Sequence, residues 1–501
     1  MTRFIEKLKV FPYHIAGLPL FFISHGYSEY TWLIPVDSLL LLLAGLLACS
    51  FLLWFILRKS LFPSGIKAGL AATGFLAVLL FYAVLQEFFK NSGFLSWFSR
   101  YRYLLPAVGI AIVLLFLYLK RSRHNFLRTT LYLNILFIVL VAVDTGVIAT
   151  NLLTTRIQPV AAKIDTNTFL LPDSVKKPDI YFIILDGYSG SAALKSHFNY
   201  DNSRFENTLH SRGFFVAATA ASNYPSTVLS MTSILTMDTV YWLKGRGRVQ
   251  ARDYSVAQTV IQNSEVPRFL QSIGYRLYNF SLFDIDREPA FVGFGFIPVK
   301  LQLLTLKTLP GRIIKDMGWD ALVAGNDDGL AQYYREDLRK SIQRMLSATR
   351  NVARESPGKP KFIYTHFMMP HIPYLYDSTG REIRIDYSNL GTMPEQQFDN
   401  AYLQYLVYAS NMVSGLVKDI QEATKGNAVI MIMSDHGYRG MPGEKRPVPW
   451  MNNLNAVYIP GKDYRLFYDS VSNVNQFRIL FNTLFKTGLP LLPDNMRFSY
   501  F

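Results

Sequence analysis

The sequence predicts a multi-span α-helical membrane domain followed by an α/β domain with a mostly parallel central sheet. Hydrophobic residues make up 50% of the 501 positions, and the long apolar stretches gather in the first 153 residues. Beyond residue 178, short apolar runs alternate with helix-like stretches, which is typical of a sheet covered by helices on both faces. We therefore expect a transmembrane domain at 1–153, a tether at 154–177 and an extracytoplasmic domain at 178–501.

The first domain contains four apolar stretches that are long enough, or nearly so, to cross a bilayer, at 33–57, 68–89, 103–119 and 129–153. The stretch 11–27 is shorter and contains His14, Pro19 and His25, so it is either a fifth span or an interfacial segment. The domain therefore has four to five helices. Polar groups in or beside spans rarely lack a role, which draws attention to His14, His25 and Asp144.

The charged loops favour the five-span arrangement. With five spans, the loops at 1–9, 58–67 and 120–128 share one side of the membrane and carry ten Lys and Arg residues. The opposite side carries Lys90, Arg100 and Arg102. The positive-inside rule then places the amino terminus in the cytoplasm and the region after residue 153 outside. No signal-peptide cleavage site follows the first apolar stretch, so we expect that stretch to be retained.

Composition also limits the partners of the protein. The net charge of +15 comes partly from the loops just described, and the outer domain has no basic run with interleaved aromatic residues. This pattern argues against nucleic acid and favours membrane lipids, in particular phosphate-bearing ones. The single cysteine, Cys49, lies within a predicted span, which excludes disulfides and cysteine metal ligands from the outer domain. Oligomeric state is not specified by composition.

Six strand-like runs are expected in the outer domain, at 180–185, 214–218, 275–280, 362–365, 428–433 and 455–459. Helical stretches lie between them at 202–211, 332–349 and 395–424. No internal repeat is present. The stretch 287–328 has weak periodicity and five glycines. We interpret it as an insertion that lies either over the site or against the membrane.

Two of these runs end abruptly in metal-ligand side chains. Asp186 follows the first run, and Asp435 and His436 follow the fifth. Asp-Gly pairs are common in turns, but two adjacent ligand-type side chains after a buried strand are costly unless something pairs with them. Ligand sites of α/β sheets gather at the carboxyl ends of the strands. We therefore expect Asp186, Asp435 and His436 to form one metal site.

A hydroxyl group accompanies this predicted metal site. Residues 223–236 read as a loop that feeds a helix, with Thr227 in the first turn. Unpaired N–H groups at a helix start stabilise a bound anion, and coordination to a divalent ion lowers the pKa of a hydroxyl enough for attack. Ser226 is the alternative nucleophile. His366 and His371 flank a Pro-rich turn and are expected to hold a substrate oxyanion or to protonate a leaving group. The combination indicates metal-activated phosphoryl or sulfuryl transfer.

The order of these motifs resembles the alkaline phosphatase/sulfatase superfamily, whose fold the outer domain is then expected to share. The membrane anchor resembles the branch of lipoteichoic acid synthases and lipid A phosphoethanolamine transferases of bacteria. The resemblance implies a metal-binding set and a catalytic set. The implied metal ligands are Asp186, Thr227, Asp435 and His436, and the implied catalytic residues are Thr227 as nucleophile with His366 and His371 in contact with the transferred group.

The resemblance also implies a reaction and a location. A phosphoethanolamine or phosphoglycerol group would pass from a phospholipid to a lipid or glycan acceptor through a phosphothreonine, outside the bacterial inner membrane. Three oxygens and one nitrogen suit one divalent ion, Zn²⁺ or Mn²⁺, with Mg²⁺ or Ca²⁺ tolerated. The alternatives are a phosphodiesterase or sulfatase-like hydrolase, and a metal-free lipid-sensing regulator.

Three departures from the resembling enzymes stand out. The membrane transferases usually have Glu at the position of Asp186, and the phosphoethanolamine enzymes have disulfides that this chain cannot form. Classical sulfatases need a Cys or Ser that is converted to formylglycine and followed by Pro-x-Arg. Neither that cysteine nor that arginine lies near Thr227, so classical sulfatase activity is not expected.

Overall fold

The computed structural model describes residues 2–31, 34–154, 175–243, 248–292, 301–314, 329–356, 358–385, 393–440 and 450–495. The chain forms two compact units, one of residues 1–158 with 298–317 and one of residues 159–297 with 318–501. Most of the expected tether, 155–174, lies outside the described residues. Residues 301–314, the described part of 298–317, group with the N-terminal unit.

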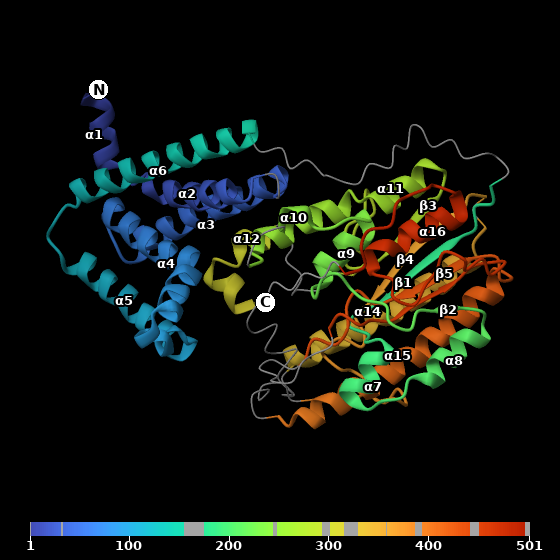
Figure 1. Cartoon of the computed structure of the whole chain (residues 1–501). Helices are drawn as coiled ribbons and strands as arrows, with labels where there is room; N and C mark the ends of the chain where they lie inside the picture. The colour runs from blue at the N-terminus through green and yellow to red at the C-terminus, as the bar shows by residue number, and fades with distance from the viewer. Residues whose placement is uncertain are drawn as a thin grey trace. The chain divides into compact units, whose positions relative to one another are not determined.

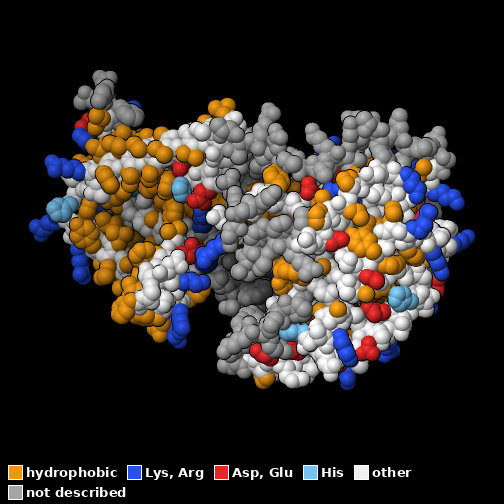
Figure 2. All heavy atoms as spheres, viewed as in Figure 1, with side chains coloured by type: hydrophobic (Ala, Val, Ile, Leu, Met, Phe, Trp, Pro, Cys, Tyr) orange, Lys and Arg blue, Asp and Glu red, His pale blue; other side chains and the backbone are white. Residues whose placement is uncertain are grey.

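The N-terminal unit is helical (Figure 1). Its elements are α1 (Thr2–Val10), α2 (His14–Glu29), α3 (Val36–Ser60), α4 (Gly65–Asn91), η1 (Gly93–Ser99), α5 (Tyr101–Arg121), α6 (Leu127–Thr154) and the short α12 (Gln302–Thr305). Within the described residues, α3, α4, α5 and α6 are long and apolar enough to cross a membrane. Figure 2 shows hydrophobic side chains gathered on the surface of this unit. The 16-residue α2 packs against α3, α4 and α6.

Polar side chains join these helices at two levels. The Asn134 side chain accepts a hydrogen bond from the His14 amide at 2.6 Å and donates to the Leu8 carbonyl at 2.7 Å. Farther along the same helices, Asp144 lies 3.3 Å from His25 Nδ1 and accepts from the Ser24 hydroxyl at 3.2 Å. The polar residues of α2 and α6 therefore pair with one another inside an otherwise apolar bundle.

The C-terminal unit is a six-stranded sheet in the order β2-β6-β5-β1-β4-β3. Its strands are β1 (Ile180–Leu185), β2 (Phe215–Val216), β3 (Arg276–Phe280), β4 (Lys361–Phe367), β5 (Val429–Met433) and β6 (Asn455–Tyr458). The pairs β3–β4, β4–β1 and β1–β5 are parallel, whereas β6 runs antiparallel to β5 and β2. The prediction of a mostly parallel central sheet is therefore confirmed.

Helices cover both faces of this sheet, as Figure 1 shows. One layer consists of α9 (Thr227–Thr236), α10 (Ala251–Gln262), α11 (Glu265–Ser272) and α16 (Gln476–Phe485), with η2 (Tyr241–Leu243) and η4 (Asn473–Asn475) nearby. The other consists of α7 (Ser191–Phe198), α8 (Ser203–Ser211), α14 (Gly329–Arg354) and α15 (Glu395–Ala423). A strand between two such layers has no solvent-facing side, and for that reason β1 reads as an unbroken apolar run.

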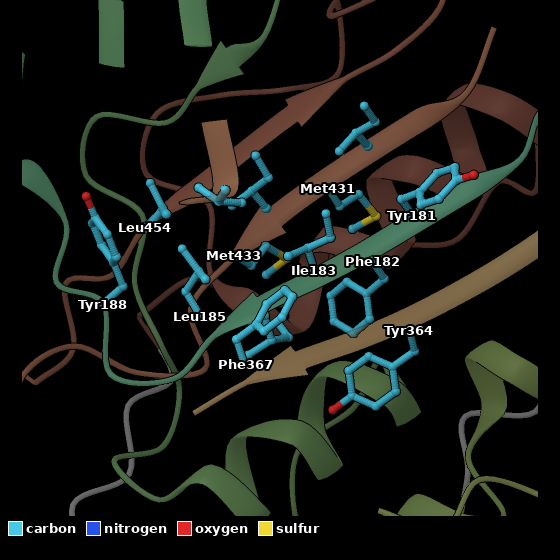
Figure 3. Packing of buried hydrophobic residues seen from close by; sticks show 14 of the residues in the cluster. Tyr181, Phe182, Ile183, Leu185, Tyr188, Tyr364, Phe367, Met431, Met433 and Leu454 are labelled. Atoms are coloured by element: carbon cyan, nitrogen blue, oxygen red, sulfur yellow. The ribbon is translucent and has the colours of Figure 1, made fainter. Parts of the chain in front are cut away.

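The core lies on both sides of β1 (Figure 3). All six residues of β1 are buried. On one face, the Phe182 ring stacks on Tyr364 at 5.2 Å and meets Phe477 of α16 edge-on at 4.9 Å. The parallel register pairs Ile184 with Met433 of β5. Continuing that register by two residues sets Asp186 beside Asp435, so this packing positions the candidate site.

Candidate active site

Asp186, Asp435 and His436 meet at the carboxyl ends of β1 and β5. His436 Nε2 lies 3.6 Å from Asp186 Oδ1 and 3.3 Å from Asp435 Oδ2. Among the residues that the structure describes, these three form a group whose ligand atoms all lie within 4.8 Å of one another. All three side chains are at most 1% exposed. The strand ends thus bring together the three residues that the sequence assigned to a metal site.

Thr227 joins this group from the first turn of α9. Its Oγ1 lies 3.3 Å from Asp186 Oδ2 and 3.3 Å from His436 Nε2. Thr227 is half-buried, whereas Asp186, Asp435 and His436 are buried. Thr227, rather than the neighbouring Ser226, makes these contacts. Its hydroxyl therefore stands between the buried cluster and the accessible side of the site.

The two histidines that flank the Pro-rich turn are held differently. His366 belongs to β4 and is fully buried, with Nε2 3.7 Å from Asp186 Oδ2 and Nδ1 2.9 Å from the Tyr364 hydroxyl. His371 is half-buried, with Nδ1 2.6 Å from the Ile372 carbonyl and Nε2 2.5 Å from Arg439 Nη2. Because a guanidinium only donates, Nε2 of His371 must accept and Nδ1 must carry the proton. The contacts thus select one neutral tautomer of His371.

The charges of the cluster follow from burial and from mutual interaction. Burial alone would raise the pKa of Asp186, but His371, His366 and His436 together hold it below its usual range. Burial lowers the pKa of His436 and of His371, and Asp186 opposes this shift only in part. Near neutral pH these shifts favour an ionised Asp186 and neutral His371 and His436. Metal ions bind side chains in these protonation states.

Several buried atoms of the cluster make no hydrogen bond. Asp186 Oδ1, Asp435 Oδ2 and His366 Nε2 have no hydrogen-bond partner within the part of the chain that the structure describes. A buried polar atom left unpaired typically costs about 1–3 kcal/mol, and more when it is charged. Carboxylate oxygens and an imidazole nitrogen are also suitable donors for a divalent transition-metal ion. The residues present therefore fit a cation-binding role.

Sequence comparison identifies the family to which this domain belongs. The family model for Sulfatase matches residues 182–470, which is more than half of the chain. The protein belongs to the sulfatase family. It thus falls within the alkaline phosphatase/sulfatase superfamily, as the order of its motifs suggested. No curated protein matches the sequence.

Solved structures similar to this sulfatase-family protein include one periplasmic domain and one soluble domain. One is the C-terminal periplasmic domain of EptC from Escherichia coli in complex with Zn, at 14% identity and a TM-score of 0.40, covering 66% of this chain and 93% of that one. The other is the soluble domain of lipooligosaccharide phosphoethanolamine transferase A from Neisseria meningitidis, at 13% identity and a TM-score of 0.35, covering 63% and 90%. The family assignment rests on the sequence match.

A second ring of polar residues holds the turn that carries the ligands in this sulfatase-family site. The Asp435 carbonyl accepts hydrogen bonds from Ser222 Oγ at 2.6 Å, Ser230 Oγ at 2.5 Å and Asn473 Nδ2 at 3.1 Å. Asn473 also donates to the Ser434 carbonyl at 3.0 Å. All of these residues are buried. Their contacts fix the main chain of the turn, and with it the direction of the Asp435 and His436 side chains.

Sequence reasoning missed this second ring and Arg439. Ser230 lies on a helix whose buried positions also include Thr232, Ser233 and Thr236, so its hydroxyl does not stand out in the sequence. Asn473 lies far along the chain, in η4, and no local pattern connects it with Asp435. Arg439 is exposed and lies in a segment without periodicity, so only its contact with His371 reveals it.

Proposed function

We propose that this sulfatase-family protein is a metal-dependent transferase. It moves a phospho-head group from a phospholipid or similar phosphodiester to an envelope acceptor, through a phosphothreonine on Thr227. One observation carries the proposal: a threonine hydroxyl at the start of a helix lies 3.3 Å from both a carboxylate and an imidazole of a buried ligand cluster. A hydroxyl in such a place is suited to nucleophilic attack on a bound anion.

A divalent cation held by the implied ligands would lower the pKa of the threonine hydroxyl and offset the charge of the phosphate. These ligands are Asp186, Thr227, Asp435 and His436, a set of three oxygens and one nitrogen that suits Zn²⁺ or Mn²⁺. The free amides of the first turn of α9 stabilise the phosphate oxygens, since the first N–H groups of a helix have no partner within it.

In the first displacement, Thr227 Oγ1 forms a bond to phosphorus while the ester bond to the donor alcohol breaks. The proton lost by the threonine hydroxyl ends on the departing alcohol. Arg439 and half-buried His371 face this transferred group, and the guanidinium charge stabilises its anionic oxygens. Fully buried His366 takes a different part, because it lies against Asp186 Oδ2 and positions that carboxylate.

In the second displacement, an acceptor hydroxyl attacks phosphorus and the bond to Thr227 Oγ1 breaks. The proton of the acceptor returns to the threonine, which restores the enzyme. If water takes the place of the acceptor, the same residues perform a hydrolysis. Classical sulfatase chemistry is disfavoured, because the nucleophile position holds threonine and the single cysteine lies in α3.

We place the enzyme in the bacterial cytoplasmic membrane with its C-terminal unit on the periplasmic or extracellular side. Four helices suited to crossing a membrane support the anchor, and the Lys and Arg excess of alternate loops supports this orientation. In this position, the donor and acceptor are membrane lipids or glycans of the envelope.

The proposed function is tested in membranes that contain the protein and a phospholipid with a labelled head group. We expect the label to move to an envelope acceptor with wild-type protein and to stay on the donor with Thr227→Ala. Release of free head group, with no labelled acceptor, would make the enzyme a hydrolase. A wild-type protein that neither binds metal nor turns over lipid would contradict both reactions and favour a regulatory lipid sensor.

A further inference from the structure

Residues 301–314 interrupt the sequence of the C-terminal unit, between β3 and α14, yet they belong to the N-terminal unit. The stretch 301–305 includes α12, which packs against α2. Of the predicted 287–328 insertion, residues 301–314 lie with the helical unit, whereas 287–292 belong to the C-terminal unit. The chain therefore passes from the C-terminal unit to the N-terminal unit and back again.

The apolar part of this contact is closely fitted. Leu304 is fully buried, and a Cβ atom at Gly26 of α2 would lie only 2.0 Å from Leu304 Cδ2. Leu303 beside it is also buried. Glycine at position 26 thus leaves the space that the Leu304 side chain fills. The fit is that of a packed interface, in which neighbouring side chains interlock.

A main-chain contact accompanies the apolar one. Helix α4 has a break in its helical geometry at Phe81, where φ is −113° and ψ is 19°. Two residues later, the Ala83 amide donates a hydrogen bond to the Lys307 carbonyl at 3.1 Å. An amide in an unbroken helix has its acceptor within the helix, so the break makes this donor available to another segment.

Charged side chains close both ends of the contact. Lys307 Nζ lies 2.5 Å from Glu29 at the end of α2 and 5.5 Å from the centre of the Tyr30 ring. Arg312 donates to Gln86 at 3.0 Å and lies 3.1 Å from Glu87, both near the end of α4. Apolar, main-chain and charged contacts therefore all join the segment to the carboxyl-terminal ends of α2 and α4.

We propose that residues 301–314 form a latch by which the C-terminal unit docks on the helical unit. The docking site consists of Gly26 and Glu29 of α2 with Ala83, Gln86 and Glu87 of α4. Without the latch, the units are joined by the stretch from 154 to 175, which spans at most about 70 Å when fully extended. With the latch docked, the stretch from 292 to 301 joins the C-terminal unit to the latch. Its fully extended length then limits the separation of the two units to about 30 Å.

This difference in reach has a consequence for substrate delivery, which rests on the proposed function. Restricting the reach from about 70 to about 30 Å reduces the accessible volume and raises the local concentration of membrane lipid at the catalytic domain roughly tenfold. Loss of the latch should therefore lower turnover of a phospholipid by up to about tenfold and leave turnover of a soluble phosphodiester unchanged. The docking itself does not depend on catalysis and is measured separately.

The docking test uses the full chain with a specific protease site placed within 155–174 and an affinity tag at the amino terminus. One cut there leaves the latch as the remaining link between the fragments. We expect the C-terminal fragment of the otherwise wild-type chain to co-purify with the tagged fragment after the cut. Lys307→Glu and Glu29→Lys should each release it, and the two changes combined should restore co-purification, because the ion pair is re-formed with reversed charge.

A matched control is Lys340→Glu on α14, where an exposed lysine pairs with Glu336 at 3.5 Å. This charge reversal should not affect co-purification. Retention of the fragment in Lys307→Glu and Glu29→Lys alike would overturn the proposal, as would release of the wild-type fragment. Catalytic failure of the wild type would leave this result intact and would count against the proposed function alone.

A covalent test covers the case in which charge reversal disturbs folding. In a Cys49→Ser background, Gly26→Cys with Leu304→Cys brings two thiols side by side, because a Cβ at position 26 would lie 3.4 Å from Leu304 Cγ. After the cut, the fragments should migrate as one band on a non-reducing gel and as two after reduction. The pair Gly45→Cys with Leu304→Cys should give two bands, because nothing lies within 4 Å of a Cβ at position 45. Absence of cross-linking in the first pair would contradict the latch.

Discussion

Buried carboxylate oxygens of Asp186 and Asp435 that accept no hydrogen bond in the described part of the chain predict that a divalent cation stabilises the folded protein. We expect added Zn²⁺ or Mn²⁺ to raise the unfolding temperature of the wild type, by an amount equivalent to about 2.7 kcal/mol at a metal concentration of 100 Kd. Asp435→Asn should abolish this shift, because it removes a charged ligand from a site that provides few others. Elemental analysis of the two purified proteins gives an independent reading. Equal metal content in both would contradict the assignment of Asp435 as a ligand.

The serines around the Asp435 carbonyl predict a non-additive effect on stability. Ser222 and Ser230 both donate to this oxygen, so each one partly replaces the other when it is lost. We expect Ser222→Ala or Ser230→Ala to lower the free energy of unfolding by about 1 kcal/mol or less, and the double change to cost more than the sum, about 2–3 kcal/mol. Chemical denaturation of the four proteins measures this coupling. Strict additivity would show that the two hydroxyls act independently.

At the scale of elements, the turn after β1 predicts different outcomes for two substitutions of Gly187. Its φ of +76° suits glycine, whereas the space around a Cβ is adequate, with the nearest atoms of His371 and His436 at 3.9 Å. Gly187→Ala should cost about 1–2 kcal/mol of stability from backbone strain and retain turnover. Gly187→Val adds methyl groups toward the two histidines and should reduce turnover. Equal activity of the two variants would contradict this view of the turn.

The sequence predicted those elements whose pattern is local. The apolar run of β1 and the ligands after β5 are visible without a structure, because a central parallel strand is buried on both faces and its end is a common ligand position. The contacts of His366 and Asn473 were not predictable in this way. His366 contacts Asp186, and Asn473 contacts the Asp435 carbonyl. In each case the two residues are distant in sequence. The docking of 301–314 also escaped prediction in detail, since its weak periodicity allowed two placements.

At the scale of the whole molecule, the helical unit is expected to matter for lipid substrates and not for the chemistry itself. A protein that begins near Lys176 retains the catalytic residues and lacks the unit on which the latch docks. It should turn over a soluble chromogenic phosphodiester at a rate close to that of the full chain. Its turnover of phospholipid in vesicles should be lost or greatly reduced. Equal loss on both substrates, or equal activity on both, would contradict delivery through the anchor.

The central claim is that Thr227 carries the phosphoryl group between donor and acceptor. Its most direct test is to react the full-length protein with a phosphodiester donor in the absence of acceptor, quench it in acid and map the modified peptide by mass spectrometry. We predict a phospho-head-group adduct on Thr227 in the wild type, an adduct at the same position in Thr227→Ser, and none in Thr227→Ala, with a loss of turnover of roughly 10³-fold or more in the last. Ser226→Ala should retain the adduct on Thr227. An adduct on Ser226, with Thr227 unmodified, would contradict the account.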